Sequence, residues 1–306
     1  MSDTLSPLGY DFFADVEGTR SMAHTLEAGV RFKTQLNALS RLEENLFGLP
    51  ARLQALEEQG VAIPATLVDQ MGRQTEQLKQ VSAETREVAE RYQQSLQPRV
   101  DALWRIIEQN DRLIGEDGYE AHGQAITSNQ KEGDRLKLEM EQAEEAIHDC
   151  FNEAANQTRL LLQQVTHLER AAEALKAATF TLDRGEVLID AAEGAEQLQP
   201  GGQPLEGVLF LTTQRLIFEQ RQEVVKSRFF LFSKKERIEK VRFAEPLNQV
   251  SNVSLQPQHG AQRLHLTLTK RANVPHATFG LNNHAQQWLT RVNQVRLGEL
   301  QPTGSR

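Results

Sequence analysis

Apolar residues recur every three or four positions through roughly the first 180 residues of the chain. This period places one apolar stripe along one face of an α-helix. The segments that carry it run from Phe12 to Phe47, over about 64–114 and over about 136–179. A helix with so narrow a stripe must bury it against a partner helix. The pattern therefore predicts long antiparallel helices, a coiled-coil bundle, joined at short breaks.

Glycine and proline mark where these helices are expected to end. The predicted breaks are Gly48-Leu49-Pro50, the turn Glu58–Ala65 and the three-glycine segment Gly115–Gly123. Pro98 lies inside the first long run, where it removes one backbone hydrogen bond and predicts a kink or a break. Cys150, the single cysteine, falls on the last stripe, where a small buried apolar side chain is a better interpretation than a reactive thiol.

After Phe180 the pattern changes to short apolar runs separated by turn residues. The segment Arg263–Lys270 alternates leucine with polar residues, which is typical of a strand with one buried face and one exposed face. The chain closes with an amphipathic helix whose apolar face consists of Ala285, Trp288, Leu289, Val292 and Val295. About seven strands and one terminal helix predict a β-sandwich or a partly open barrel with a helix that caps it.

One hairpin in this half carries a family resemblance. Gly207–Gln220, GVLFLTTQRLIFEQ, places the polar Thr212-Thr213-Gln214-Arg215 between two apolar runs. This order of Gly, apolar strand, Thr, Arg and second apolar strand resembles the signature of GRAM domains, which belong to the pleckstrin-homology-like (PH-like) superfold. The resemblance covers about 120 residues, Leu182–Leu300. It departs from the family at Thr213-Gln214 and in the long segment 224–243, and it implies a PH-like β domain with a C-terminal capping helix.

The residues of the signature have structural roles in this interpretation. They are Gly207, Leu211, Thr212, Arg215, Leu216, Phe218 and Trp288. Glycine suits a close approach between strands, and threonine hydroxyls can satisfy backbone groups of a turn. Two interpretations of Arg215 remain: an ion pair that holds the hairpin within the domain, or a place on a ligand surface.

The two patterns predict an α + β multidomain chain. An N-terminal antiparallel helical coiled-coil region is expected over 1–180, a GRAM/PH-like domain over 181–300 and a disordered tail over 301–306.

Charge separates the same two halves. The chain has a net charge of −8, of which residues 181–306, with 16 basic and 12 acidic residues, contribute +4. Residues 1–180 hold 18 basic and 30 acidic residues, a net charge of −12, so this half is a poor partner for nucleic acid. The single cysteine suits a reducing compartment, and the sequence shows neither a secretory signal nor an apolar run long enough to span a bilayer. These features predict a cytoplasmic protein, with any membrane contact peripheral and at the inner surface.

Motifs that carry catalysis or bind metals and cofactors are missing from the sequence. It has no HExxH, CxxC, GxxxxGK[ST] or nucleophile-elbow pattern, and its eight histidines are scattered without ligand spacing. We therefore expect no catalytic residue, metal or cofactor, and no enzymatic activity.

The strongest candidate for a binding surface is the segment VVKSRFFLFSKKERIEKVRF, residues 224–243. Its candidate binding residues are Lys226, Arg228, Phe229, Phe230, Phe232, Lys234, Lys235 and Arg237. Aromatic residues flanked by lysine and arginine are typical of peripheral domains that meet anionic lipid. The same pattern also fits docking to a protein, or a strand whose phenylalanines complete the sandwich or pack on the coiled coil while its charges face water.

The predicted function is therefore non-enzymatic. The first hypothesis is an adaptor in which a coiled-coil stalk carries a GRAM/PH-like module that docks to an anionic membrane surface or a protein partner, with self-association through the helices. The alternative is a purely structural coiled-coil scaffold whose C-terminal domain is a cap or a protein-interaction module.

Overall fold

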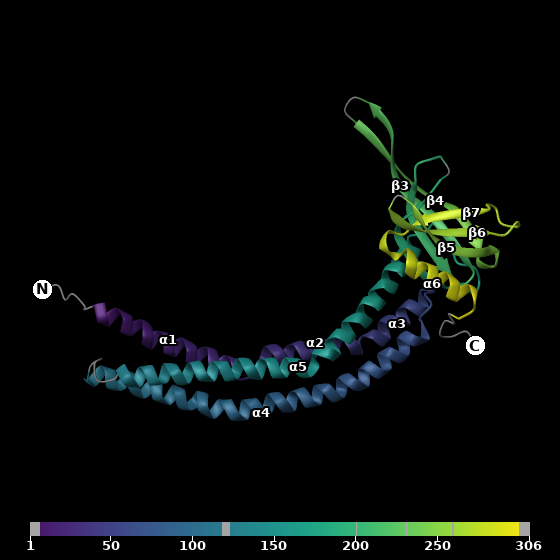
Figure 1. Ribbon diagram of the computed structural model, residues 1–306. Helices are drawn as coiled ribbons and strands as arrows, with labels where there is room; N and C mark the ends of the chain where they lie inside the picture. Colours follow the sequence, from purple (N-terminus) through teal and green to yellow (C-terminus); the bar gives the residue numbers. More distant parts are fainter. Residues whose placement is uncertain (1–6, 118–122, 200, 230–231, 259, 300–306) are drawn as a thin grey trace. The chain divides into compact units, whose positions relative to one another are not determined.

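The computed structural model describes the backbone of residues 7–117, 123–199, 201–229, 232–258 and 260–299. Side chains are described within these ranges except at 7–16, 113–117, 123, 224–229, 232–236 and 283. The tail predicted as disordered, 301–306, lies outside the described residues. Long helices are followed by an antiparallel sheet and a C-terminal helix, which confirms the predicted fold class (Figure 1).

Within the described residues, five α-helices precede the sheet. They are α1 Pro7–Gly29, α2 Lys33–Phe47, α3 Leu49–Glu58, α4 Ala65–Asp117 and α5 Gly123–Lys176. The single helix expected over Phe12–Phe47 is wrong, because the chain leaves the helix after Gly29 and Phe32 adopts a φ of 48°. Pro98 lies within α4 without ending it.

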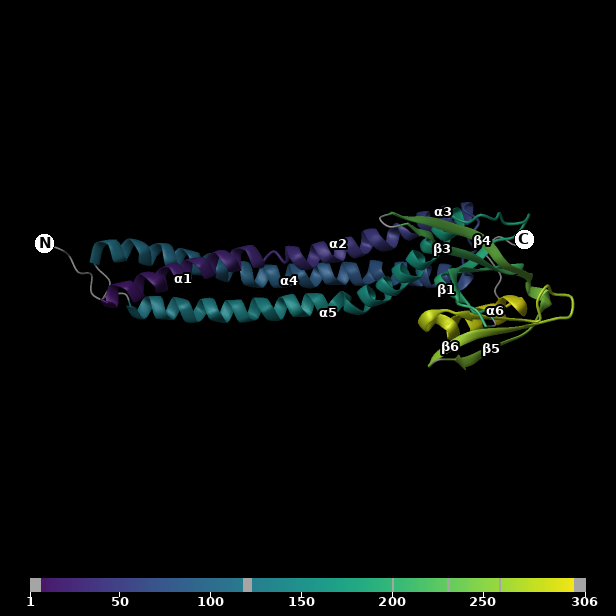
Figure 2. The ribbon, with the colours of Figure 1, turned by 90° about the horizontal axis from the view of Figure 1, so that it is seen from above.

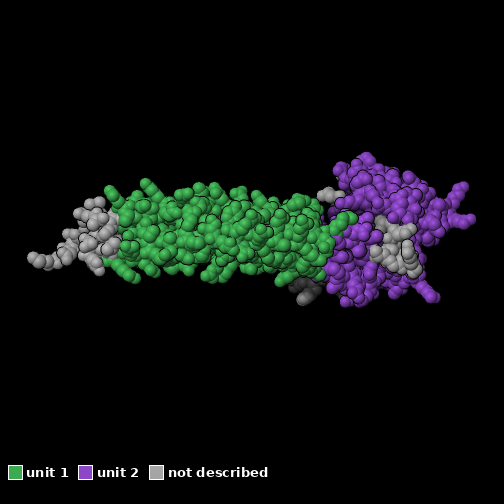
Figure 3. Space-filling view, turned by 90° about the horizontal axis from the view of Figure 1, so that it is seen from below, with its two compact units in different colours: residues 1–47, 73–159 green, residues 48–72, 160–306 purple. Residues whose placement is uncertain are grey.

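The chain forms two compact units (Figure 3). Residues 1–47 and 73–159 make up the first, called here the helical unit, and residues 48–72 and 160–306 make up the second, called the sheet unit. The helices α4 and α5 each contribute residues to both units. The stretch 160–180, which the sequence groups with the helical region, is thus helical up to Lys176 but packs with the sheet.

In the helical unit, α4 runs antiparallel to α5, and α1 and α2 lie beside them (Figure 2). Gln74 of α4 donates to the carbonyl of Ala154 at 3.1 Å, whereas Arg99, further along α4, pairs with Glu132, earlier in α5, at 3.0 Å. These helices share one core, to which α1 with the residues that follow it, α4 and α5 all contribute. Its buried members are Ala23, Leu26, Val30, Phe32, Ala89, Leu96, Val100, Leu103, Ile107, Leu136, Met140, Ala143 and Ile147. The apolar stripes seen in the sequence are thus buried within one chain.

Two positions of these stripes differ from expectation. Gln74 interrupts the apolar pattern in the sequence, yet it lies in the core, 6% exposed, because its amide finds a backbone carbonyl. Cys150 is only half-buried, and the neighbouring Phe151, 3% exposed, occupies the core instead. The thiol of Cys150 contacts the carbonyl of Ala146 on its own helix.

The sheet has seven strands in the order β4-β3-β2-β1-β7-β6-β5, and every neighbouring pair is antiparallel. The strands are β1 Leu188–Gln197, β2 Leu205–Thr212, β3 Arg215–Phe229, β4 Phe232–Pro246, β5 Val250–Gln258, β6 Ala261–Leu268 and β7 His276–Gly280. Two short 3₁₀ helices, η1 Leu247–Gln249 and η2 Asn282–His284, lead into β5 and into α6 Ala285–Arg296.

The core of the sheet unit contains a group of aromatic rings among aliphatic side chains. Phe279 lies between Phe218 and Phe243, with ring centroids 5.6 and 5.4 Å away. Trp288 and Val292 of α6 belong to the same buried cluster. Helix α6 therefore packs on β5 and β6, as the three- and four-residue spacing of its apolar residues predicts.

Residues 48–72 are joined to the sheet through backbone hydrogen bonds. The amide of Ala62 donates to the carbonyl of Leu188 at 2.7 Å, and the amide of Leu188 donates to Gly60 at 2.8 Å. On α3, Arg52 pairs with Glu169 of α5 at 2.7 Å. The sheet unit thus includes α3 and the end of α5, and not only the segment after residue 180.

Candidate functional site

The strands β3 and β4 extend beyond the rest of the sheet as a two-stranded ribbon. Strand β2 pairs with β3 only from Leu211↔Leu216 to Gly207↔Gln220. Pairing between β3 and β4 continues from there to Phe229↔Phe232. In Figure 1 this part of the hairpin, in green, stands away from the other strands. The segment that the sequence singles out for binding therefore lies mostly on a ribbon that the rest of the sheet does not cover.

Most of the predicted binding residues have undescribed side chains. The structure describes only the backbone, paired within the ribbon, of Lys226, Arg228, Phe229, Phe232, Lys234 and Lys235. Phe230 lies wholly outside the described residues. Whether these phenylalanines are exposed or buried stays a prediction.

The base of the ribbon is described in full. Arg237 is exposed, with its Nε 2.7 Å from Oε1 of Glu239. Lys240 is exposed as well. Arg242 donates from Nε to Oε1 of the buried Gln220 at 2.8 Å, which fixes the point where the ribbon leaves the sheet. The described basic residues thus follow β4 from the sheet toward the candidate segment.

The signature hairpin lies in the core. Leu211, Leu216 and Phe218 are fully buried, and Trp288 is 2% exposed. Gly207 is the point of closest approach between β2 and β3. A Cβ at this position would lie 2.9 Å from Cα of Gln220 and closer still to the carbonyl oxygen of Glu219. Only glycine fits that crossing without a backbone shift.

Thr212 and Arg215 belong to one ion-pair network. Arg215 donates from Nη2 to Glu186 at 2.8 Å, and the hydroxyl of Thr212 donates to the same carboxylate at 2.5 Å. Burial raises the pKa of Glu186, but hydrogen bonds from Arg215, Thr212 and the Asp183 amide outweigh it and lower the pKa overall. Arg215 thus pairs within the domain, which is the first of its two interpretations. Sequence reasoning missed Glu186, because nothing local marks a lone glutamate as the partner of an arginine 29 positions away.

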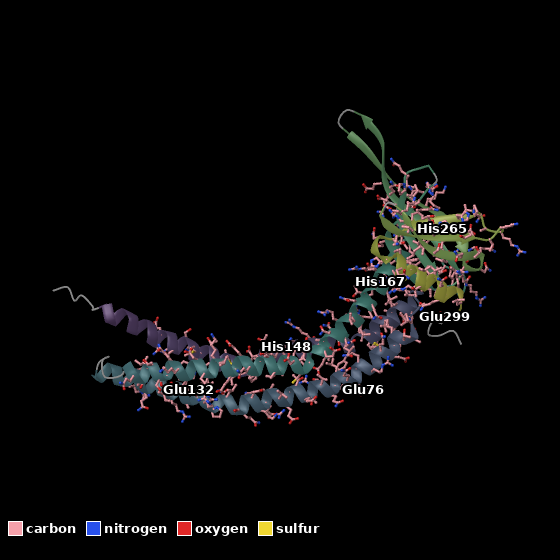
Figure 4. All side chains as sticks on the ribbon, in the orientation of Figure 1. Glu76, Glu132, His148, His167, His265 and Glu299 are labelled. Atoms are coloured by element: carbon pink, nitrogen blue, oxygen red, sulfur yellow. The ribbon has the colours of Figure 1, made fainter. Side chains whose placement is uncertain are left out.

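A second network that the sequence did not indicate is centred on Asp190 of β1. This carboxylate is 0% exposed. Its Oδ1 accepts from Nε2 of His167, on α5, at 2.7 Å and from the Ala191 amide at 2.8 Å, while Arg291 of α6 pairs with Oδ2. Figure 4 shows His167 on α5 close to the sheet. Asp190 thereby connects three elements of the sheet unit.

The protonation of His167 follows from this environment. The contact with Asp190 favours the charged imidazole. Burial, followed by the positive charges of Arg291 and Arg170, nevertheless lowers the pKa of His167 below its usual 6.5. The short contact with Asp190 requires a proton on Nε2, so the neutral ring keeps its lone pair on Nδ1.

This lowered pKa predicts an acid-sensitive sheet unit. Because its pKa is lower in the folded than in the unfolded chain, His167 resists protonation in the native state. The stability that it contributes is present above pH 6.5 and is lost as the pH falls through the folded-state pKa. We expect His167→Gln, which keeps an N–H for Asp190 but cannot titrate, to flatten the loss of stability below this pH. Urea unfolding of both proteins across a pH series measures it, with His148→Gln of the helical unit as the control. Equal pH profiles for His167→Gln and the unchanged chain would contradict the assignment.

A third network joins the end of α5 to β3. Glu219, 0% exposed, accepts from the amide of Thr179 at 2.6 Å and from Arg221 Nε at 2.7 Å. Arg221 also donates to the carbonyl of Ala174 at 2.9 Å and lies over the ring of Phe210, 5.7 Å from its centroid. Three buried carboxylates in the sheet unit, Glu186, Asp190 and Glu219, are therefore each paired with an arginine.

The histidines form no metal site in the described residues, where no group of three or more His, Cys, Asp or Glu side chains is arranged to hold an ion. His265 and His276 stack with ring centroids 5.5 Å apart on β6 and β7. Burial and the neighbouring His276 lower the pKa of His265, and its Nδ1 lies 2.9 Å from Oγ1 of Thr278. The positions of the two histidines on neighbouring strands account for this stacking.

No protein-family model matches the chain, and no curated protein matches it in sequence. Among solved structures, the chain is similar to a chain in the structure of human RhoA in complex with the DH/PH fragment of PDZRHOGEF. The identity is 12% and the TM-score 0.32 over 96% of each chain. A complex of PDZ-RhoGEF DH/PH domains with GTP-gamma-S activated RhoA gives 13% identity and a TM-score of 0.29 over 93% of this chain and 94% of that one. The C-terminal domain of an unknown protein from Leishmania infantum gives 15% and 0.26 over 37% and 87%. At these TM-scores the matches carry no conclusion about partners or activity, and the GRAM resemblance stays a resemblance.

Proposed function

We propose that the chain is a non-enzymatic adaptor whose sheet unit docks to an anionic membrane surface through the β3–β4 ribbon. The observation that carries the proposal is that this ribbon leaves the sheet after Gln220. Between residues 226 and 242 the sequence holds seven basic residues and two acidic ones. On a basic projection of this kind, attraction to anionic head groups contributes about 1 kcal/mol of binding free energy for each Lys or Arg near the surface. A GRAM/PH-like module with cytoplasmic, peripheral localisation is the form of protein that this arrangement favours.

Any membrane contact by the described residues is peripheral in this proposal. No helix among them is long and apolar enough to cross a bilayer. The helical unit buries its stripes within one chain, so the helices serve here as a scaffold that does not depend on a second copy. Self-association through the outer faces of the helices would be an additional contact, which the fold of the helical unit does not require.

Flotation of the full chain with vesicles tests the proposal. We expect binding to phosphatidylcholine vesicles that contain phosphatidylserine, weak binding to phosphatidylcholine alone, and a decrease with rising salt. Lys234→Glu with Lys235→Glu is expected to abolish binding, because it replaces two attractive charges with two repulsive ones. Lys131→Glu with Lys137→Glu, on exposed positions of α5, changes the net charge equally and is expected to leave binding intact.

The outcomes separate the hypotheses. Equal loss in the two double variants would show that net charge, and not the ribbon, governs binding. Absence of vesicle binding by the unchanged chain would remove the membrane proposal and leave the structural scaffold as the better account.

A further inference from the structure

A cavity of about 260 Å³ opens beside the Asp190 network in the sheet unit. It lies between α5, β1, η2 and α6, away from the ribbon on which the proposed function rests. Its charged and titratable lining residues are His167, Arg170, Asp190, Glu193, His284 and Arg291. The cavity is smaller than the roughly 300–1,000 Å³ typical of drug-sized ligands, so it suits a small polar group.

Two arginines, Arg170 and Arg291, bring guanidinium donors to this lining. Arginine carries five N–H donors. No acidic side chain among the described residues pairs with Arg170, which is exposed. Arg291 pairs with Asp190 through Nη1, and no acidic side chain among the described residues pairs with its Nε or Nη2.

The acidic residues of the lining are Asp190 and Glu193. Asp190 is wholly buried, and its oxygens are taken by His167, the Ala191 amide and Arg291. Glu193 is exposed at the rim. Asp190 therefore acts as a positioning residue that holds Arg291 and His167 against the cavity.

We propose that this cavity binds a phosphate group through Arg170 and Arg291. Guanidinium groups match the oxygens of phosphate through paired N–H donors, and these charge-assisted bonds are among the strongest in proteins. The two arginines come from α5 and α6, so a bound phosphate links these helices across β1. The group is recognised as a phosphomonoester, whether free or on a lipid head group.

Protonation of His167 strengthens this site. A proton on Nδ1 adds a donor and a positive charge to the lining, where His284 also lies. Arg170 and Arg291 face His167 from α5 and α6, and Asp190 and Glu193 face it from β1. Sulfate, which stays a dianion across this pH range, therefore binds more tightly at low pH.

The experiment titrates inorganic phosphate into the full chain and follows thermal unfolding and isothermal calorimetry. We expect saturable binding that Arg170→Ala weakens about tenfold or more, because it removes a charge-assisted donor. Arg159→Ala, another exposed arginine of α5, is the matched control and is expected to bind as the unchanged chain does. Arg291→Lys tests the second arginine while it keeps a cation for Asp190.

Further arms identify the source and the role of His167. Flotation with phosphatidylcholine vesicles that contain phosphatidic acid shows whether a lipid phosphomonoester enters, and a Lys234→Glu/Lys235→Glu background removes the contribution of the ribbon. That background is expected to bind inorganic phosphate normally, so failure of the ribbon proposal leaves this one intact. His167→Gln is expected to abolish the pH dependence of sulfate binding. Equal phosphate affinity in the unchanged chain and Arg170→Ala, or no saturable binding, would overturn the proposal.

Discussion

Arg291→Ala is expected to lower the free energy of unfolding of the sheet unit by about 2–3 kcal/mol, below the roughly 3–5 kcal/mol for a fully buried ion pair that loses one partner, because the Arg291 side chain is 36% exposed. The reason is the complete burial of Asp190, whose Oδ2 pairs with Arg291. Without that cation a carboxylate would stay in the interior with too little compensation, or would have to take up a proton. Three elements, α5, β1 and α6, would be loosened together.

The two tryptophans make this prediction measurable unit by unit. Trp104 belongs to the helical unit and Trp288, 2% exposed, to the sheet unit. In a Trp104→Phe background, the fluorescence of Trp288 during urea unfolding reports on the sheet unit. The double change Arg291→Ala with Asp190→Ala is expected to be less destabilising than Arg291→Ala alone, because it removes the stranded charge. A double variant that is less stable by the sum of the two single effects would show that the pair is not coupled.

Gly207→Ala is the second change with a large expected effect, a loss of about 3 kcal/mol at the upper end of the range for overpacked positions. The obstacle is backbone: a methyl group would meet Cα of Gln220 at 2.9 Å and the Glu219 carbonyl oxygen at a shorter distance still. Neither atom can turn aside as the end of a side chain can. The strands β2 and β3 would have to separate at the point where the ribbon begins.

Gly72→Ala is the matched control for this change. Gly72 lies inside α4, in the same unit, and a Cβ there would meet no atom within 4 Å. Alanine is favoured over glycine in helices, so this variant is expected to gain about 0.5–1 kcal/mol. The same fluorescence measurement reports both changes. Equal effects of the two substitutions would show that the close approach at Gly207 has no energetic weight.

Periodicity predicted the elements of this chain well because each element buries one face. The stripe on α4 and α5, the alternation of β6 and the apolar face of α6 are all local patterns that register in a sequence window. The break before α2 escaped although α1 ends at Gly29, because the apolar Phe32, whose φ is 48°, gives no sign of a turn. Gln74 also escaped, because a glutamine is buried only where a carbonyl such as that of Ala154 happens to face it.

The charged networks lay beyond prediction for a related reason. Asp190, His167 and Arg291 come from three elements, and Arg291 is 124 positions from His167. Each alone resembles an ordinary surface residue. The candidate ribbon, by contrast, was predicted from its run of basic and aromatic residues. The length of the ribbon could not be predicted, because pairing of β3 and β4 out to Phe229↔Phe232 depends on register rather than on composition.

The way α5 enters the sheet unit determines where the chain can be cut. A fragment that begins at residue 181 would keep the β domain of the resemblance but lose His167 and Thr179. Asp190 and Glu219 would then each lack a hydrogen-bond donor that they have in the full chain. We expect proteases to spare this junction. The smallest fragment that folds as the sheet unit does in the full chain should therefore include the last turns of α5.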